Sequence, residues 1–257
     1  MDEENKDNVI NITNNIMMKK SKFIGLLVIL VSITSISSFF IGTYTTNLDA
    51  DKNMQFNFDN EIPKLESQSK GNPIVAEVNG QKVRVEEVKD VIKTGFTQGQ
   101  MLNSTSALDM IITKDLLLEE AQNRDITITM SDAEKKLTAS YVQKGLSKEQ
   151  FEEKLGEFGT TYDQTLERFR EELIINELLT NEISKIGIQI SDEEAKTFFD
   201  NNKEMIKTQV GNGTVFDDVS SQIKTNLLQQ KQQQLVLDFI ENLKSKATII
   251  TYQEMLQ

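Results

Sequence analysis

Paired carboxylates are the side chains of this sequence best suited to acid–base or metal chemistry. They occur at Glu119/Glu120, Glu152/Glu153 and Glu171/Glu172. Adjacent positions on a helix point about 100° apart, so no pair converges on one atom. The sequence has no His and no Cys, which removes the commonest general base, the commonest transition-metal ligand and any thiol nucleophile. We therefore expect solvated helix faces, no catalytic residue, no metal site and no cofactor.

The overall charge narrows the choice of partners. The sequence has 40 acidic residues against 28 basic ones, for a net charge of -12. Binding to a phosphate backbone needs clustered Lys and Arg, so a nucleic-acid partner is not expected. With 257 residues and 38% hydrophobic content, the chain is long enough to bury one good helical core.

An uncharged apolar segment near the N-terminus is long enough to cross a membrane. Residues Phe23–Tyr44 contain no charged side chain. At about 1.5 Å per residue, a helix of this length spans a hydrocarbon core of about 30 Å. The sequence thus predicts a transmembrane signal anchor at residues 23–45, embedded in the lipid bilayer.

The residues that flank this segment give its orientation. Lys19, Lys20 and Lys22 precede it and acidic residues follow it, so the positive-inside rule makes residues 1–22 a cytoplasmic tail and places the C-terminal domain outside the cytoplasmic membrane. A cleaved secretory signal also combines a basic start with an apolar run. The polar, partly acidic stretch before Lys19 and the lack of a clear A-x-A site favour the uncleaved anchor.

A polar segment separates the expected anchor from the rest of the chain. Residues 46–72 are rich in Asn, Asp, Lys, Gln and Ser, with weak apolar periodicity. This composition is typical of a flexible linker. We expect the folded domain to occupy residues 73–257.

Four segments of this domain begin with a helix-start signature, in which a Ser or Thr is followed three residues later by Glu or Gln. The signatures are Ser131/Glu134, Ser147/Gln150, Thr161/Gln164 and Ser191/Glu194. The hydroxyl caps a backbone N–H, and the Glu or Gln reaches back to the cap residue. Short breaks containing Gly145, Gly156 or Gly187 separate the segments, so we expect a compact all-helical body.

Short strands are expected at both ends of this domain. Ile74–Val78 and Gln81–Val85 flank Asn79-Gly80, a strong hairpin signal because both turn residues tolerate positive φ. A two-stranded hairpin is marginal alone. The β-branched segment at residues 247–252 is the candidate third strand, which would join the two ends of the domain.

Two further helices are expected from the apolar pattern. The first follows the hairpin at about residues 85–93, and residues 94–104 are expected to form a loop. The last covers about residues 216–246, where apolar side chains recur at steps of three or four.

Several segments of this helical body resemble a known family. They are Ala107–Ala121, Ile126–Glu134, Gly145–Phe151, Ile190–Ala195, Phe216–Val219 and Leu227–Lys231. Together they are similar to the N-terminal chaperone domain of the SurA, PrsA and PpiC foldases. The resemblance implies a mainly α fold, a SurA N-domain-like body of about seven helices with a small sheet made by its N- and C-terminal strands, preceded here by one transmembrane helix.

One part of these foldases has no counterpart in the sequence. Members of the family usually carry a parvulin isomerase domain of roughly a hundred residues before the closing helix, whereas only Asn202–Val215 occupy that place here. Parvulin sites also use a His pair, and this chain has no His. The resemblance therefore implies the substrate-holding part without prolyl isomerase activity.

The family resemblance predicts a chaperone that holds unfolded or exported polypeptides without ATP or catalysis. A holder needs adaptable apolar surface with polar partners, and the candidates for peptide contact are Tyr141, Phe151, Phe158 and Tyr162. Aromatic residues at helical spacing also commonly belong to the core. The alternative function is a structural or adaptor module that binds one fixed envelope or membrane partner.

Two sequons fall in expected exterior loops. Asn103-Ser104-Thr105 and Asn212-Gly213-Thr214 match the acceptor pattern for N-glycosylation. Asn103 and Asn212 are therefore possible glycosylation sites.

Overall fold

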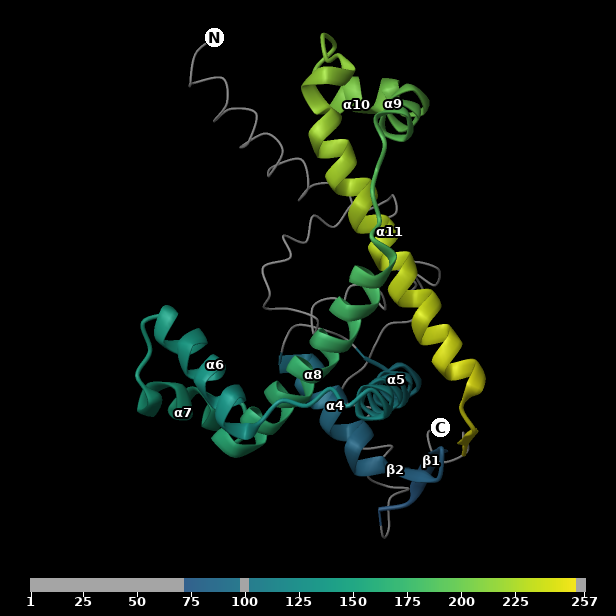
Figure 1. The fold of residues 1–257 in the computed structure, drawn as a ribbon. Helices are drawn as coiled ribbons and strands as arrows, with labels where there is room; N and C mark the ends of the chain where they lie inside the picture. Colours follow the sequence, from purple (N-terminus) through teal and green to yellow (C-terminus); the bar gives the residue numbers. More distant parts are fainter. Residues whose placement is uncertain (1–71, 98–101, 253–257) are drawn as a thin grey trace. The chain divides into compact units, whose positions relative to one another are not determined.

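The computed structural model describes residues 72–97 and 102–252, which form eight helices and one three-stranded sheet (Figure 1). The mainly helical architecture with a small sheet is as expected, with one helix more than the seven anticipated. The expected tail, membrane anchor and nearly all of the linker, residues 1–71, lie outside the described ranges. None of the eight helices is long and apolar enough to span a bilayer.

The described chain forms two compact units. One contains residues 183–237, and the other contains the remaining described residues up to position 182 together with 238–252. Each unit is described separately below.

The sheet joins the two ends of the second unit. Its strands β1 (Ile74–Val78), β2 (Gln81–Arg84) and β3 (Ile249–Thr251) lie in the order β2-β1-β3, and both pairings are antiparallel. Asn79 and Gly80 have φ angles of 49° and 87°, as the predicted hairpin turn requires. The predicted pairing of the terminal strands is therefore confirmed.

The core of this unit lies between the sheet and helices α4 (Val85–Thr97) and α5 (Ser104–Asn123). Val75, Val83, Val88, Ile92 and Leu108 are among its buried residues, and Leu243, Ala247 and Ile249 pack against it. Two predicted boundaries were wrong. Val85 opens α4 instead of ending β2, and α4 continues past residue 93, because the buried stripe extends through Ile92 to the small buried residue Gly95, which the apolar pattern did not register.

Local hydrogen bonds fix where the next helices begin. The capping box at Ser147 opens α7 (Lys148–Glu157) as predicted. Thr161 opens α8 (Tyr162–Ile186), with its Oγ1 accepting from the Gln164 N–H at 3.3 Å and the Gln164 Oε1 accepting from the Thr161 N–H at 3.1 Å. The predicted start at Ser131 was wrong: α6 (Met130–Gln143) is capped by Thr129, whose Oγ1 accepts from the Asp132 N–H at 3.1 Å.

Glycine positions explain the helix ends. Gly145 and Gly187 have positive φ, 76° and 59°, at the ends of α6 and α8, as the predicted breaks require. Gly156 was a wrong choice because it lies inside α7. The break falls at Gly159 instead, which has φ 69°.

The unit of residues 183–237 is a small helical assembly with its own core. It contains α9 (Asp192–Asn201), α10 (Lys203–Val210) and the part of α11 (Phe216–Lys246) up to Leu237. Ala195, Phe199, Ile206 and Ile223 are buried together. As predicted, Ser191 caps α9 and α11 begins at Phe216. The segment between α9 and α11 was not assigned from the sequence, and most of it forms α10.

Candidate peptide-binding site

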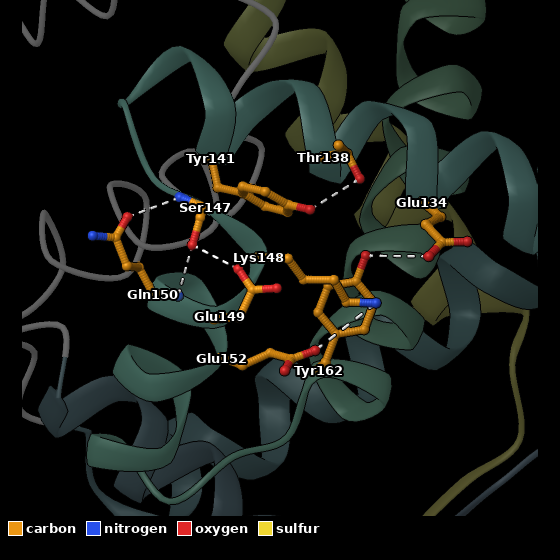
Figure 2. A network of polar contacts seen from close by, with 9 residues as sticks. All are labelled: Glu134, Thr138, Tyr141, Ser147, Lys148, Glu149, Gln150, Glu152 and Tyr162. Atoms are coloured by element: carbon orange, nitrogen blue, oxygen red, sulfur yellow. Dashed lines mark hydrogen bonds and ion pairs between the residues drawn. The ribbon is translucent and has the colours of Figure 1, made fainter.

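Helices α6, α7 and α8 bring three of the four candidate aromatic residues into one cluster. Figure 2 shows two of them, Tyr141 and Tyr162, with the polar groups around them. The rings of Tyr141 and Phe151 are stacked, with centroids 4.7 Å apart and planes 20° apart. Tyr162 meets Phe151 edge to face, at 6.3 Å and 88°. Both arrangements are favourable for aromatic pairs.

The turn between α6 and α7 positions Phe151 against Tyr141. Gly145 adopts positive φ, and the Leu146 N–H donates to the Tyr141 carbonyl at 3.0 Å, which closes the end of α6. Gln150 Oε1 then accepts from the Ser147 N–H at 2.9 Å, while the Gln150 N–H donates to Ser147 Oγ at 3.3 Å. This capping box starts α7 immediately after the turn, so Phe151 lies in its first turns and faces α6.

The cluster is apolar inside and polar at its edge. Tyr141 is buried with Ala133, Leu137 and Leu166, while the Tyr141 hydroxyl donates to Thr138 Oγ1 at 3.4 Å. The Tyr162 hydroxyl donates to Glu134 Oε1 at 3.4 Å, and the Lys148 ammonium lies 4.3 Å from the Tyr162 ring centroid. Desolvation raises the pKa of the Tyr162 hydroxyl above its ordinary value.

Phe158 does not belong to this cluster. It follows α7 as its C-cap residue and is 59% exposed. The structure therefore divides the four candidates: three pack against one another, and Phe158 presents an apolar ring to solvent. Peptide contact at these four positions remains a prediction.

Two exposed apolar residues on α6, Met130 and Val142, are not among the four candidates. Met130 is 42% exposed and Val142 is 57% exposed. Val142 directly follows Tyr141, which belongs to the buried stripe, so a helical-wheel reading places Val142 about 100° away from the core. This offset from the buried stripe is the sequence signal that could have identified Val142 as exposed. Together with Phe158, these side chains give the α6–α7 helix pair apolar surface that is not used in its own core.

Members of two of the carboxylate pairs have polar partners at close range. Glu119 Oε2 accepts from Asn79 Nδ2 at 2.7 Å, and Glu120 pairs with Arg124 at 2.6 Å. Glu171 pairs with Lys114 at 3.0 Å. All three pairs were expected as solvated faces. Glu152 and Glu153 are exposed as expected, and Glu120 has a local partner four residues away, whereas tertiary packing supplies the partners of Glu119 and Glu171. Within the described ranges, no group of three potential ligand side chains could hold a metal ion.

The two sequon asparagines have different environments. Asn103 caps α5, with its Oδ1 accepting from the Ser106 N–H at 2.8 Å. Asn212 is exposed in the loop that follows α10. Glycosylation of either residue remains a prediction.

Comparison with known proteins supports the SurA/PrsA-type resemblance. No family model matches the chain. A foldase protein PrsA from Caldanaerobacter subterraneus subsp. tengcongensis is 28% identical over 151 residues, covering 51% of this chain and 43% of the foldase. The chain thus spans less than half the length of that relative.

A solved structure is similar in fold. It comes from a description of PEB4 and the periplasmic protein Cj1289 as two structurally related SurA-like chaperones of Campylobacter jejuni. The match has a TM-score of 0.55 and 14% identity, and it covers 70% of this chain and 99% of the solved one. The resemblance to SurA/PrsA-type proteins that the sequence indicates is confirmed, in sequence by the first match and in fold by the second.

Proposed function

We propose that this chain is a membrane-anchored, extracytoplasmic chaperone that holds unfolded or exported polypeptides without ATP and without prolyl isomerase activity. The observation that carries the proposal is the SurA-like fold, matched over 99% of a solved chain described as a SurA-like chaperone. The sequence similarity to a PrsA foldase supports the same class of function.

The α6–α7 helix pair supports a holding role in chemical terms. An unfolded polypeptide presents apolar side chains, and weak binding needs apolar surface that the holder's own core does not use. Phe158 and Val142, 59% and 57% exposed, provide such surface. The rings of Tyr141, Phe151 and Tyr162 pack against one another and join these two helices to α8.

The proposed lack of isomerase activity rests on the chain between α9 and α11. Residues 202–215 fold as the short helix α10 and its flanking loops. The absence of His throughout the sequence supports the same proposal.

The proposed location rests on the sequence alone. The uncharged segment Phe23–Tyr44 and the lysines before it favour a single pass through the cytoplasmic membrane, with the N-terminus in the cytoplasm and residues after 45 outside. A holder at this position would meet polypeptides as they leave the membrane.

Suppression of aggregation tests the holding function. The full-length chain, kept in mild detergent, is mixed with several unrelated proteins as they unfold, and light scattering is followed. We expect suppression for all of them without ATP. Phe158→Ser should weaken it, whereas Ile250→Ser, which replaces a 46% exposed residue on the sheet, should leave it unchanged.

Two results would count against the proposal. If the parent chain suppresses none of the test proteins, the holding function is wrong. Tight binding to a single envelope protein, with no effect on the others, would indicate the adaptor module instead.

A further inference from the structure

The amide of Asn79 is held on both sides by distant parts of the chain. Its Oδ1 accepts from the Thr248 N–H at 2.9 Å, and its Nδ2 donates to Glu119 Oε2 at 2.7 Å. The Asn79 N–H also donates to the Thr248 carbonyl at 2.9 Å. Asn79 therefore connects the hairpin turn, the residue before β3 and helix α5.

The residue after Asn79 makes this amide chemically vulnerable. Gly80 has no Cβ, so its backbone nitrogen can approach the Asn79 side chain more easily than that of any other residue type. When that nitrogen attacks Cγ, a C–N bond forms, the bond from Cγ to Nδ2 breaks, and ammonia leaves with the transferred proton. Water then opens the resulting succinimide to aspartate or isoaspartate, so the overall reaction consumes one water and releases one ammonia.

We propose that Asn79 is a latent self-modification site, silent while Thr248 and Glu119 hold its amide and reactive once β3 detaches. Rotation of the side chain toward Gly80 must break the bonds to Thr248 and Glu119. The reaction therefore proceeds from the small fraction of molecules in which this region is open. Each modified chain has therefore passed through the open state, and it keeps the modification afterwards.

Modification also prevents the same attachment from forming again. An aspartate side chain at position 79 has no N–H to donate to Glu119, and it places a carboxylate where the amide lay 2.7 Å from the Glu119 oxygen. Two like charges at this separation repel. Isoaspartate additionally lengthens the main chain at the turn and disturbs the pairing of β1 with β2.

The chain has an internal reference for this chemistry. Asn212-Gly213 is the same dipeptide, and Asn212 is exposed. In the part of the chain that the structure describes, the Asn212 side chain makes no hydrogen bond like those that hold Asn79. Its amide is therefore expected to react from the folded state.

Peptide mass spectrometry of the full-length chain, aged at mildly alkaline pH, compares the two sites directly. We expect Asn79 to convert more slowly than Asn212 by about tenfold or more in the native protein, because its reaction waits for opening. In denaturant the two rates should become similar. Equal native rates would overturn the proposal, and so would a slow Asn79 that persists in denaturant.

Variants at positions 79 and 119 test whether an aspartate at position 79 weakens the attachment to Glu119. Asn79→Asp should lower Tm by about 2–6 °C, and adding Glu119→Gln should restore it, because the amide introduced at position 119 can donate to the carboxylate introduced at position 79. Glu119→Gln alone keeps an acceptor for Asn79 and should unfold near the parent temperature. If Asn79→Asp does not fold, recovery in the double variant decides the question. An unchanged Tm in Asn79→Asp, or a double variant that is no more stable than it, would contradict the role assigned to this amide.

Discussion

Lys244, near the end of α11, forms an ion pair with Asp109 on α5, with 2.6 Å between Nζ and Oδ1. The pair links positions 135 apart in the sequence. Both side chains are partly exposed, so this contact alone stabilises the fold by only about 0–1 kcal/mol. Its importance is positional, because it places the end of α11 where β3 can pair with β1.

Apolar packing of β3 should stabilise this closure more than the ion pair does. Ile249 packs against the core, whereas its neighbour Ile250 is 46% exposed. We expect Ile249→Ala to lower the free energy of unfolding by roughly 1–3 kcal/mol, and Ile250→Ala by less than about 0.5 kcal/mol. Chemical denaturation of the two variants measures the difference. Equal losses in the two variants would show that packing of the Ile249 side chain in the core does not hold β3.

The start of α6 offers a second matched pair. Thr129 caps this helix, and Ser131 is exposed just inside it. Thr129→Ala should destabilise the protein by about 1 kcal/mol because the Asp132 N–H loses its acceptor, whereas Ser131→Ala should have almost no effect. Thermal unfolding followed by circular dichroism checks both. A larger loss of stability in Ser131→Ala than in Thr129→Ala would indicate that the helix begins at Ser131, as predicted from the sequence.

Asp115 should make stability depend on pH in an uncommon direction. Burial, with Glu87 and Glu171 nearby, raises its pKa from 3.8 to about 6, and Lys114 only partly offsets this. The folded chain thus binds this proton more tightly than the unfolded chain. The stability it contributes is fully present below about pH 4 and is lost as pH rises through about 6.

Replacing Asp115 with an uncharged residue should remove this loss of stability at neutral pH. We expect Asp115→Asn to raise the free energy of unfolding by roughly 1–3 kcal/mol at pH 7 and by much less at pH 4. The exposed Asp125→Asn is the control. Denaturant titrations at both pH values measure the effect. If the gain in the free energy of unfolding is the same at both pH values, ionisation of Asp115 is not the cause of the gain.

The proposed absence of isomerase activity gives a direct enzymatic prediction. Only α10 and its loops lie between α9 and α11, and the sequence has no His. We expect the full-length chain to give no rate above background with proline-containing tetrapeptides. A PrsA-type foldase with its isomerase domain serves as the positive control. Turnover that persists through repurification would contradict this prediction.

The proposed membrane topology can be checked in intact cells. Because lysines precede the apolar segment Phe23–Tyr44, we expect protease added outside to degrade the domain after residue 72 and to spare a tag at the N-terminus. Permeabilised cells provide the control, in which the tag should also be lost. Recovery of a soluble form that begins after residue 45 would instead indicate a cleaved signal.

The sequence by itself determined the features that depend on near neighbours. The Asn79-Gly80 turn, the caps at Ser147, Thr161 and Ser191 and the bounds of α11 follow from residues that contact one another within a few positions. Such hydrogen bonds and periodic apolar stripes form in much the same way whatever surrounds them. For this reason the fold class was predictable, whereas the pairing of the terminal strands was predicted because a two-stranded hairpin needs a third strand for stability.

Tertiary structure decided which side of each element is buried. Tyr141 and Phe158 were equal candidates from the sequence, but Tyr141 is packed in the cluster and Phe158 is left 59% exposed. Ile249 and Ile250 differ only in the face of β3 on which they lie, and the polar partners of Glu119 and Glu171 come from distant turns and helices. Burial and charge pairing depend on which distant surfaces meet, and a single sequence does not specify those contacts one residue at a time.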